Sequence, residues 1–190
     1  MKDKIIASIN SHFDLSDDMI SKAGLIEEAA DKIIASLKNG GTLYICGNGG
    51  SAADSQHFAA ELIGRFLIER EPIKALALTA NTSILTAIGN DYGYDKVFER
   101  QVDAFLGPKD ILFGISTSGN SANIINALKM AKKKGALTMS LLGCGGGKIA
   151  QESDFPIICS SNETPRVQEM HILIIHILCS VIENKLFPSN

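Results

Sequence analysis

The stretch DILFGISTSGNSANI at residues 110–124 combines an apolar run, a polar loop and the start of a helical pattern. The apolar run, 110–115, does not alternate with polar residues, which is typical of a strand buried on both faces of a parallel sheet. The polar loop follows directly, and a helix is predicted over 121–134. A strand that leads through a loop into a helix is the repeating unit of α/β folds.

The same unit recurs on both sides of this stretch. Because strands and helices alternate, the sequence predicts an α/β fold with a doubly wound, five-stranded parallel sheet flanked by helices. Ligands of such folds bind beyond the carboxyl ends of the strands, so functional residues are expected in the loops that follow them. The other predicted strands are Thr42–Cys46, Ile73–Leu78, Leu137–Leu142 and Phe155–Cys159, and the other predicted helices span 51–66, 81–105 with a break at 89–93, 147–152 and 166–186.

The first forty residues have a helical pattern without strands. Apolar residues recur at helical spacing within 5–9 and 26–37, and Asn39-Gly40-Gly41 ends the second run. We therefore expect a helical N-terminal extension over 1–40 that packs on the core and at an oligomer interface. The chain as a whole, residues 1–190, has a length that suits a single domain.

The composition argues against several classes of protein. The net charge of −3 gives no basic surface for nucleic acid. The most apolar stretch, 170–182, is shorter than the roughly 20 residues that span a bilayer, and the N-terminus lacks the pattern of a signal peptide. The four cysteines form no C-x-x-C pair, which favours buried thiols in a reducing compartment. We expect a cytoplasmic protein that binds neither membranes nor nucleic acid.

Hydroxyl side chains are concentrated in the loop after the third predicted strand. Ser116, Thr117, Ser118 and Ser121 precede the N-terminus of a helix. One such residue is enough to cap a helix, so the surplus favours hydrogen bonds to the oxygens of a phosphate group, which a helix N-terminus also attracts.

Two further loops have both a functional and a structural interpretation. Gly47–Ser51 follows the first predicted strand, where glycines let the backbone approach a ligand. Alternatively it is a plain turn with Ser51 as the helix N-cap. Asn90 and Asp91 interrupt the helical region after the second strand, either as turn formers or as contacts to sugar hydroxyls.

Titratable residues that could take part in catalysis or bind a metal occur on two predicted helices. His57 and Glu61 are four residues apart and therefore share a helix face, as functional groups or as a plain surface pair. The last helix contains Gln168 and, two turns later, His176 within an all-round apolar stretch, so we expect His176 to be buried, as a functional or a core histidine. His171, at a different angle around this helix, is interpreted as structural.

Together these segments resemble the sugar isomerase (SIS) superfamily and, within it, the phosphoheptose isomerases. The resemblance covers essentially the whole chain and implies the SIS fold. The run STSGNS is fairly specific to the superfamily, whereas the combination of His57, Glu61, Gln168 and His176 is more specific to the isomerases. The matching segments are CGNGGSAADSQHFAAELIGR at 46–65, IGNDYGYDKVF at 88–98, GISTSGNSANI at 114–124 and RVQEMHILIIHIL at 166–178.

The resemblance also implies roles for individual residues. Glu61 and His176 match the catalytic pair. His57, Glu61, Gln168 and His176 match a zinc site, with one zinc per subunit and no nucleotide cofactor. Pro165 departs from the pattern, which puts a local substrate contact in doubt. The residues that match substrate contacts are Asn48, Gly49, Gly50, Glu61, Asn90, Asp91, Ser116, Thr117, Ser118, Ser121 and Gln168.

The implied reaction is an intramolecular oxidation–reduction. Sedoheptulose 7-phosphate would become D-glycero-D-manno-heptose 7-phosphate through a cis-enediol, as the first step toward activated heptose for lipopolysaccharide or capsule. Glu61 and His176 would transfer the protons. The resemblance and the apolar surface of the helices both favour a homotetramer with active sites near subunit interfaces.

Two other functions come from relatives with the same fold. Replication initiator-associating proteins are non-enzymatic, and this chain resembles them at QEMH, 168–171, and ENKLFP, 183–188. They lack the groups that match Glu61 and His176, which favours the enzyme. Sugar-phosphate-sensing domains are the third class, but these are usually fused to a DNA-binding segment, which this sequence does not contain.

Overall fold

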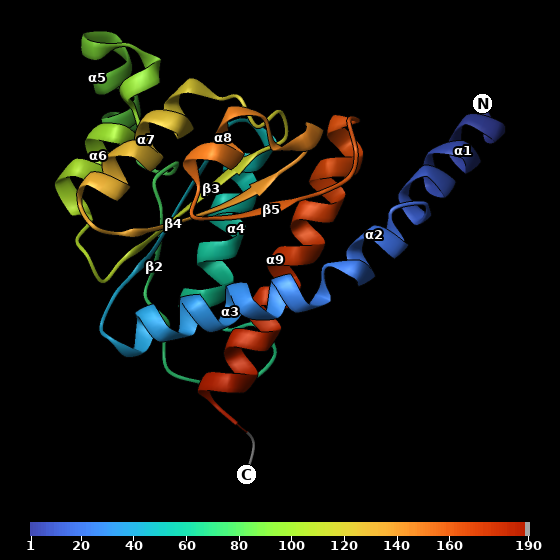
Figure 1. Cartoon of the computed structure of the whole chain (residues 1–190), viewed down its shortest axis with the longest axis horizontal. Helices are drawn as coiled ribbons and strands as arrows, with labels where there is room; N and C mark the ends of the chain where they lie inside the picture. The colour runs from blue at the N-terminus through green and yellow to red at the C-terminus, as the bar shows by residue number, and fades with distance from the viewer. Residues whose placement is uncertain (189–190) are drawn as a thin grey trace.

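A computed structural model describes residues 1–188, and its centre is an all-parallel five-stranded sheet with helices on both faces (Figure 1). The strand order is β2-β1-β3-β4-β5. This confirms the predicted SIS-type α/β fold. Residues 189 and 190, the end of the predicted domain, lie outside the described residues. The strands are β1 Leu43–Gly47, β2 Ala75–Ala77, β3 Ile111–Ser116, β4 Leu137–Leu142 and β5 Phe155–Ile158.

Both faces of the sheet are covered because its central strands are apolar on both faces. All six residues of β3 are buried. Ile111, Phe113 and Ile115 pack in the core beneath α3, α4 and α9, whereas Leu112 packs in the core beneath α6, α7 and α8. The helices of the body are α3 Ala23–Lys38, α4 Gly50–Ile63, α5 Thr82–Tyr92, α6 Glu99–Phe105, α7 Ala122–Lys133, α8 Gly147–Glu152 and α9 Thr164–Leu186, with single 3₁₀ turns at Tyr94–Lys96 and Cys144–Gly146.

The N-terminal segment divides into a packed part and a projecting part. It forms α1 Lys2–Phe13, α2 Ser16–Ser21 and α3. Helix α3 buries its apolar stripe against the sheet and α9, as its helical spacing predicts. In contrast, α1 has no buried residue and extends away from the body (Figure 1). Its large apolar residues Ile5, Ile6, Ile9 and Phe13 are all exposed.

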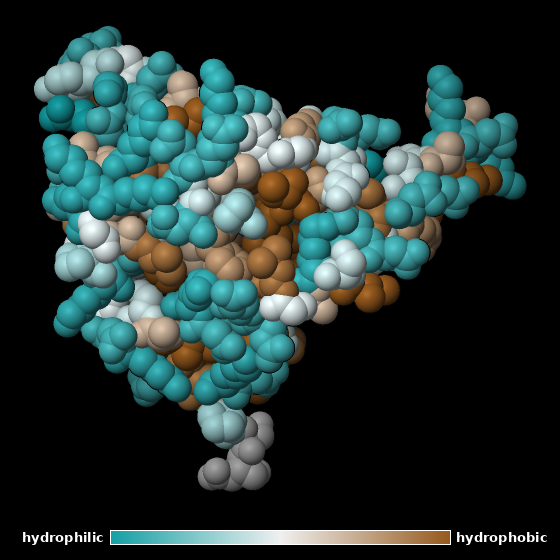
Figure 2. Space-filling view, viewed as in Figure 1, coloured by the Kyte–Doolittle hydropathy of each residue, from teal (hydrophilic) through white to brown (hydrophobic). Residues whose placement is uncertain are grey.

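Apolar side chains lie on the surface of the projecting arm and over the middle of the molecule, among polar neighbours (Figure 2). An apolar groove lies between α2, α3 and α9. We call it the α2–α9 groove. Its apolar lining consists of Met19, Ile20, Ala23, Ile26, Leu173, Ile177 and Val181.

Helix α9 passes alongside α3 and α4 and completes the core on that face. By length and composition alone it is the one helix of residues 1–188 that could cross a membrane, although 44% of its most apolar window is buried inside the protein. A buried stripe that includes Ile174, Leu178 and Ile182 packs in the core, as expected for an internal helix of an α/β fold.

Candidate functional site

The loops after β1 and β3 lie next to each other because these strands are neighbours in the sheet. Gly47, the last residue of β1, is in register with Ile115 of β3. From β1 the chain continues to β2 on one side, and from β3 it continues to β4 on the other. This reversal of direction is where open α/β sheets bind ligands. The loops after the first and third predicted strands therefore lie side by side at this edge of the sheet.

A reciprocal amide pair joins these two loops. Asn48 Nδ2 donates to Asn123 Oδ1 at 2.9 Å, and Asn123 Nδ2 donates to Asn48 Oδ1 at 2.8 Å. Asn123 lies in the first turn of α7 and is buried. Sequence reasoning missed it, because an asparagine in a predicted helix carries no signal of a partner 75 residues away.

Gly49 and Gly50 of the first loop are each required for a different structural reason. Gly49 adopts φ +56°, a conformation that favours glycine. A Cβ on Gly50 would lie 2.2 Å from Gln168 Nε2. Gly49 holds the N-cap position of α4, so the alternative interpretation of Ser51 as the N-cap is wrong.

Hydrogen bonds of three hydroxyl side chains hold the loop between β3 and α7 in shape. Ser116 Oγ and Ser121 Oγ are 3.1 Å apart. Ser121 is the N-cap of α7 but makes no side-chain cap bond. Ser118 Oγ accepts from the backbone N–H of Asn120 at 3.2 Å. Thr117 is half-buried. Hydroxyls free of capping duty at a helix N-terminus fit a phosphate group.

The neighbouring loop after β4 supports this phosphate loop. Gly119 adopts φ +65°, and a Cβ there would lie 2.2 Å from the carbonyl oxygen of Gly146. Asn120 Oδ1 accepts from the backbone N–H of Lys148 at 3.2 Å, and Asn120 Nδ2 donates to the carbonyl of Ser118 at 2.8 Å. The two loops therefore pack backbone against backbone, which leaves no room for a side chain at residue 119.

Titratable side chains of α4 and α9 contact one another within the chain. His57 Nε2 lies 2.9 Å from Glu61 Oε1 and 3.4 Å from His176 Nε2. The His176 ring also stacks on Phe66, with ring centroids 5.7 Å apart. The structure thus brings together three of the four residues that match a zinc site, including both residues of the predicted catalytic pair.

These three side chains contact one another in a line with His57 in the middle. Among residues 1–188, no group of three or more His, Cys, Asp or Glu side chains is arranged around a common point as in a metal site. The side chains of His57 and Glu61 are 43% and 25% exposed, so solvent or a ligand can reach them.

The fourth matching residue, Gln168, lies elsewhere in the chain. Its amide contacts Gly50 at the start of α4, about two helical turns, or roughly 10 Å, from His57. Within one chain it therefore belongs to the first ligand loop. This position agrees with a substrate contact, and its part in a metal site stays a prediction.

Asn90 and Asp91 also lie apart from the other site residues. They occupy the last turn of α5, are exposed and bond to each other, with Asn90 Nδ2 donating to Asp91 Oδ1 at 2.8 Å. Helix α5 has no buried residue and forms an outer corner of the molecule (Figure 1). One chain alone does not bring this pair to the loops of β1 and β3.

The buried histidine of α9 is His171 and not His176. His171 is fully buried, and burial lowers its pKa to about 4, while the nearby backbone carbonyl of Leu142 opposes this shift. His176 is only half-buried, because Leu173 and Ile177 beside it face outward. The expectation that His176 is desolvated is therefore wrong for the single chain.

Asp54 is a second residue that sequence reasoning missed. It lies one turn before His57 on α4, and its Oδ2 is buried without a hydrogen-bond partner. Burial raises the pKa of Asp54, while the charge of His57 opposes the shift. Its spacing of three residues from His57 places it on the same side of the helix and could have identified it.

Comparisons with known proteins agree with this geometry. A family model described as the SIS domain matches residues 14–143. The chain is 52% identical to a phosphoheptose isomerase of Aliarcobacter butzleri over 187 residues, which cover 98% of this chain and 99% of that protein. Among solved structures, a phosphoheptose isomerase from Neisseria gonorrhoeae has a TM-score of 0.92 at 42% identity, covering 96% of this chain and 98% of that one. One from Francisella tularensis has a TM-score of 0.93 at 35% identity, covering 96% and 97%.

Proposed function

This chain belongs to the SIS domain family and, within it, to the phosphoheptose isomerases, and from that premise we propose the reaction that it catalyses. The protein is a sugar-phosphate isomerase. Its substrate is sedoheptulose 7-phosphate and its product is D-glycero-D-manno-heptose 7-phosphate. The observation that carries this proposal is that Glu61 and His176, from two different helices, both contact His57, in a chain whose loop between β3 and α7 contains four hydroxyl residues.

Aldose–ketose exchange requires a base and an acid on the same substrate. A proton leaves one of the two reacting carbons and returns at the other, while a second proton moves between their oxygens through a cis-enediol. Glu61 and His176 supply these two groups from different helices, so they can act on different atoms of one bound sugar. Their positions on regular helices hold them in place before the substrate arrives.

The phosphate is held by neutral donors. The segment 114–124 contains no Lys or Arg. Ser116, Thr117, Ser118 and Ser121, together with the N–H groups at the start of α7, supply the hydrogen bonds. Because the protein carries a net charge of −3, local donors and not a long-range field must attract the substrate.

Zinc suits His57, Glu61 and His176 in the kind of donor atom, because imidazole nitrogen and carboxylate oxygen are usual zinc ligands. A ring nitrogen carries one N–H or one lone pair, so His57 Nε2 cannot donate to one neighbour and accept from the other. We propose one zinc per subunit, held by these three side chains and by Gln168. When bound, zinc polarises the sugar carbonyl.

A homotetramer would complete the site. Gln168, Asn90 and Asp91 are separated from the titratable cluster within one chain, so a neighbouring subunit must supply some of the predicted contacts. The exposed apolar residues of α1 and the α2–α9 groove provide surfaces for such an assembly. We therefore place the active sites near subunit interfaces.

The reaction is suited to the first step toward activated heptose for lipopolysaccharide or capsule, in the cytoplasm. Among the described residues all four cysteines are free, which agrees with a reducing compartment. The alternative, a non-enzymatic protein that binds the replication initiator, would make no use of Glu61 and His176.

The test is incubation of the purified protein with sedoheptulose 7-phosphate at pH 6–9, with and without zinc, followed by direct detection of the aldoheptose phosphate. We expect turnover without any nucleotide cofactor. Absence of product under all these conditions, in a folded protein, would overturn the proposal and favour initiator binding.

A further inference from the structure

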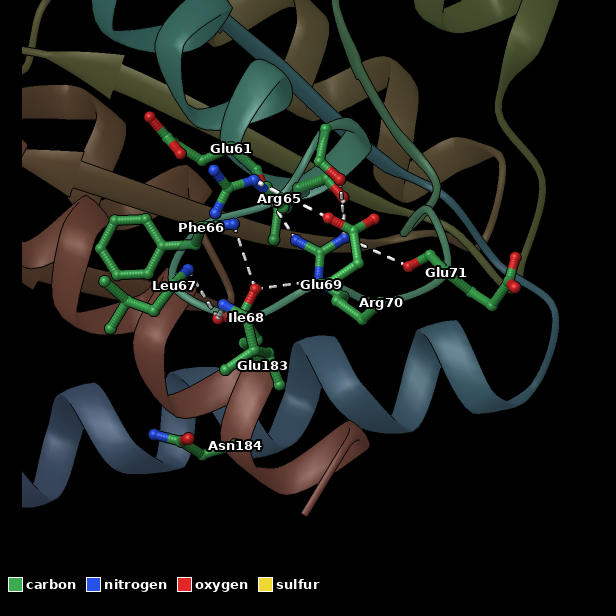
Figure 3. Close-up of polar contacts among 12 residues, drawn as sticks. Glu61, Arg65, Phe66, Leu67, Ile68, Glu69, Arg70, Glu71, Glu183 and Asn184 are labelled. Atoms are coloured by element: carbon green, nitrogen blue, oxygen red, sulfur yellow. Dashed lines mark hydrogen bonds and ion pairs between the residues drawn. The ribbon is translucent and has the colours of Figure 1, made fainter. Parts of the chain in front are cut away.

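We propose that Phe66 and the buried ion pair Arg70–Glu183 are positioning residues that fix the His176 ring and the end of the helix that carries Glu61. The inference rests on the proposed function for its kinetic consequences. It concerns the segment 64–71 after α4, in which the sequence analysis assigned no role to Phe66 or Arg70 (Figure 3).

The carboxylate of Glu183 organises this segment. It accepts hydrogen bonds from three successive backbone N–H groups, those of Phe66 at 3.1 Å, Leu67 at 2.8 Å and Ile68 at 3.0 Å. Arg70 Nε adds a fourth bond at 3.0 Å (Figure 3). Burial would raise the pKa of Glu183, but these four bonds together lower it, so the carboxylate stays ionised.

Arg70 connects this carboxylate to the end of α4. Its Nη2 donates to the carbonyl of Glu61 at 2.8 Å, and its Nη1 donates to the carbonyl of Leu62 at 2.8 Å. These carbonyls belong to the last turn of α4, where no further helical N–H can reach them. The side chains of Arg70 and Glu183 are 1% and 2% exposed, so the pair is shielded from solvent screening.

The ion pair therefore fixes two helices relative to each other. Glu183 lies seven residues after His176, two turns along nearly the same face of α9. Arg70 holds the backbone of Glu61 on α4 to that face. The ion pair thus sets the spacing of the two helices at the backbone of Glu61 itself and about two turns from His176.

Phe66 links the Arg70–Glu183 ion pair to the imidazole ring of His176. Its backbone is held by Glu183, and its ring stacks on His176 with an interplanar angle of 28°. The His57 ring meets His176 edge-on from another direction, with centroids 5.1 Å apart. A half-buried histidine otherwise rotates between rotamers, so two aromatic neighbours restrict where Nε2 points.

If the Arg70–Glu183 pair served only to stabilise the fold, apolar residues could serve as well. Replacing a buried ion pair by apolar residues of similar size is often neutral or stabilising. Here the hydrogen bonds of the pair end on the backbone of Glu61 and on the backbone of Phe66, the two residues next to the chemistry. Small displacements of catalytic groups cost rate more than they cost binding.

The decisive variant is Phe66→Leu, which keeps an apolar side chain but removes the aromatic face. We expect kcat to fall by about tenfold with KM within about twofold, and Phe66→Tyr to restore most of the loss. Phe187→Leu is the matched control, because the Phe187 ring also contacts Arg70, at 5.8 Å, but is not a neighbour of His176. Equal losses in both variants would overturn the proposal.

A spectroscopic readout on the metal-free protein separates this inference from the proposed function. With histidine labelled at Cε1 there are four signals, and His176→Gln identifies that of His176. Phe66→Leu should move the His176 signal by removing the ring current and leave that of His12 unchanged, whereas Phe187→Leu should move neither. An unmoved His176 signal overturns the positioning role even if the enzyme is active. A moved signal without isomerase activity in the wild type would overturn only the proposed function.

The same labelling tests the ion pair itself. Arg70→Lys keeps the charge but loses the planar fork that binds the carboxylate and the carbonyls of α4 together. In a protein that remains folded, we expect the His176 signal to shift or broaden and kcat to fall more than KM changes. A shift confined to melting temperature, with signal and kcat unchanged, would mean that the ion pair only stabilises.

Discussion

Asn48 and Asn123 hold each other by two hydrogen bonds, at 2.9 and 2.8 Å, and thereby join the ligand loops after β1 and β3. Each side-chain amide offers one donor and one acceptor to the other, so neither is left unsatisfied on this side. A backbone loop that is free to move would have to be ordered when the sugar phosphate binds. The amide pair orders both loops in advance, which lowers the entropic cost of binding.

Removing one half of this pair should weaken substrate binding. Asn123→Ala leaves the Asn48 amide without its partner, at a cost of about 1–3 kcal/mol in stability. We expect KM to rise at least several-fold in steady-state assays. Asn126→Ala is the control, because Asn126 lies half-buried on the same helix and donates to the carbonyl of Asp95 instead of to a ligand loop. Equal effects of the two changes would show that the pair has no special part in binding.

The Ser118 hydroxyl should contribute to phosphate binding more than to folding. Ser118→Ala removes one neutral donor, worth roughly 1 kcal/mol, which corresponds to about a fivefold rise in KM. The loss is larger if the phosphate is fully desolvated. The melting temperature should change little, because this side chain is exposed. A large loss of stability with unchanged KM would show that the loop only caps the helix and does not bind phosphate.

Gly119 should not tolerate even a methyl group. Gly119→Ala places a Cβ 2.2 Å from the Gly146 carbonyl oxygen at a left-handed backbone position. Gly40→Ala has the same kind of strain, φ +85°, but nothing within 4 Å. We expect Gly40→Ala to cost about 1–2 kcal/mol in the free energy of unfolding, and Gly119→Ala to cost clearly more and to abolish substrate binding. Similar losses would show that the two loops can separate freely.

His171 should make stability depend on pH. Its folded pKa of about 4 lies below its ordinary value of 6.5, so the unfolded chain binds the proton more readily. Stability is therefore full above pH 6.5 and falls as pH decreases toward 4, by up to about 3 kcal/mol. Denaturant unfolding of His171→Met should lose this part of the pH dependence, whereas His12→Asn, at a half-buried histidine of the projecting helix α1, should keep it. Identical profiles for His171→Met and wild type would contradict the assignment.

The fold could be predicted because its signals are local. The apolar runs and the loops after them lie within a few residues of one another, and all five predicted strands occur in the structure within one or two residues at most boundaries. The loop between β3 and α7, for which we propose phosphate binding, was located from the sequence for the same reason. The pairing of Asn48 with Asn123 could not be found, because it depends on which strands are neighbours.

The last helix shows why burial within an apolar segment is harder to predict. Apolar residues surround α9 on all sides, so periodicity does not say which face points inward. The structure shows that Val167, His171, Ile174, Leu178 and Ile182 form the buried face, which leaves His176 half-exposed. Leu173 and Ile177 are apolar but exposed, so the apolar character of this segment overstates its burial within one chain.

A variant of His57 can distinguish metal binding from proton transfer, because His57 contacts both Glu61 and His176 but is not one of the two proposed proton-transfer groups. His57→Ala removes the central nitrogen but neither catalytic group, so it should lower zinc content and reduce activity in a way that added zinc partly restores. Metal analysis of the purified variant checks the first effect independently of turnover. Normal zinc content in His57→Ala would exclude this side chain as a ligand.

The central claim is that Glu61 and His176 transfer protons on a heptose phosphate. The most direct measurement is the turnover of sedoheptulose 7-phosphate by the wild type, Glu61→Gln, His176→Gln and the double variant, followed by direct product analysis. We predict that the wild type forms the aldoheptose phosphate, that each single change reduces kcat by ~10²-fold or more in a folded protein that still binds substrate, and that the double variant is little worse than the poorer single one. Near-normal turnover by Glu61→Gln would contradict the account and leave His57–Glu61 as a helix-surface pair.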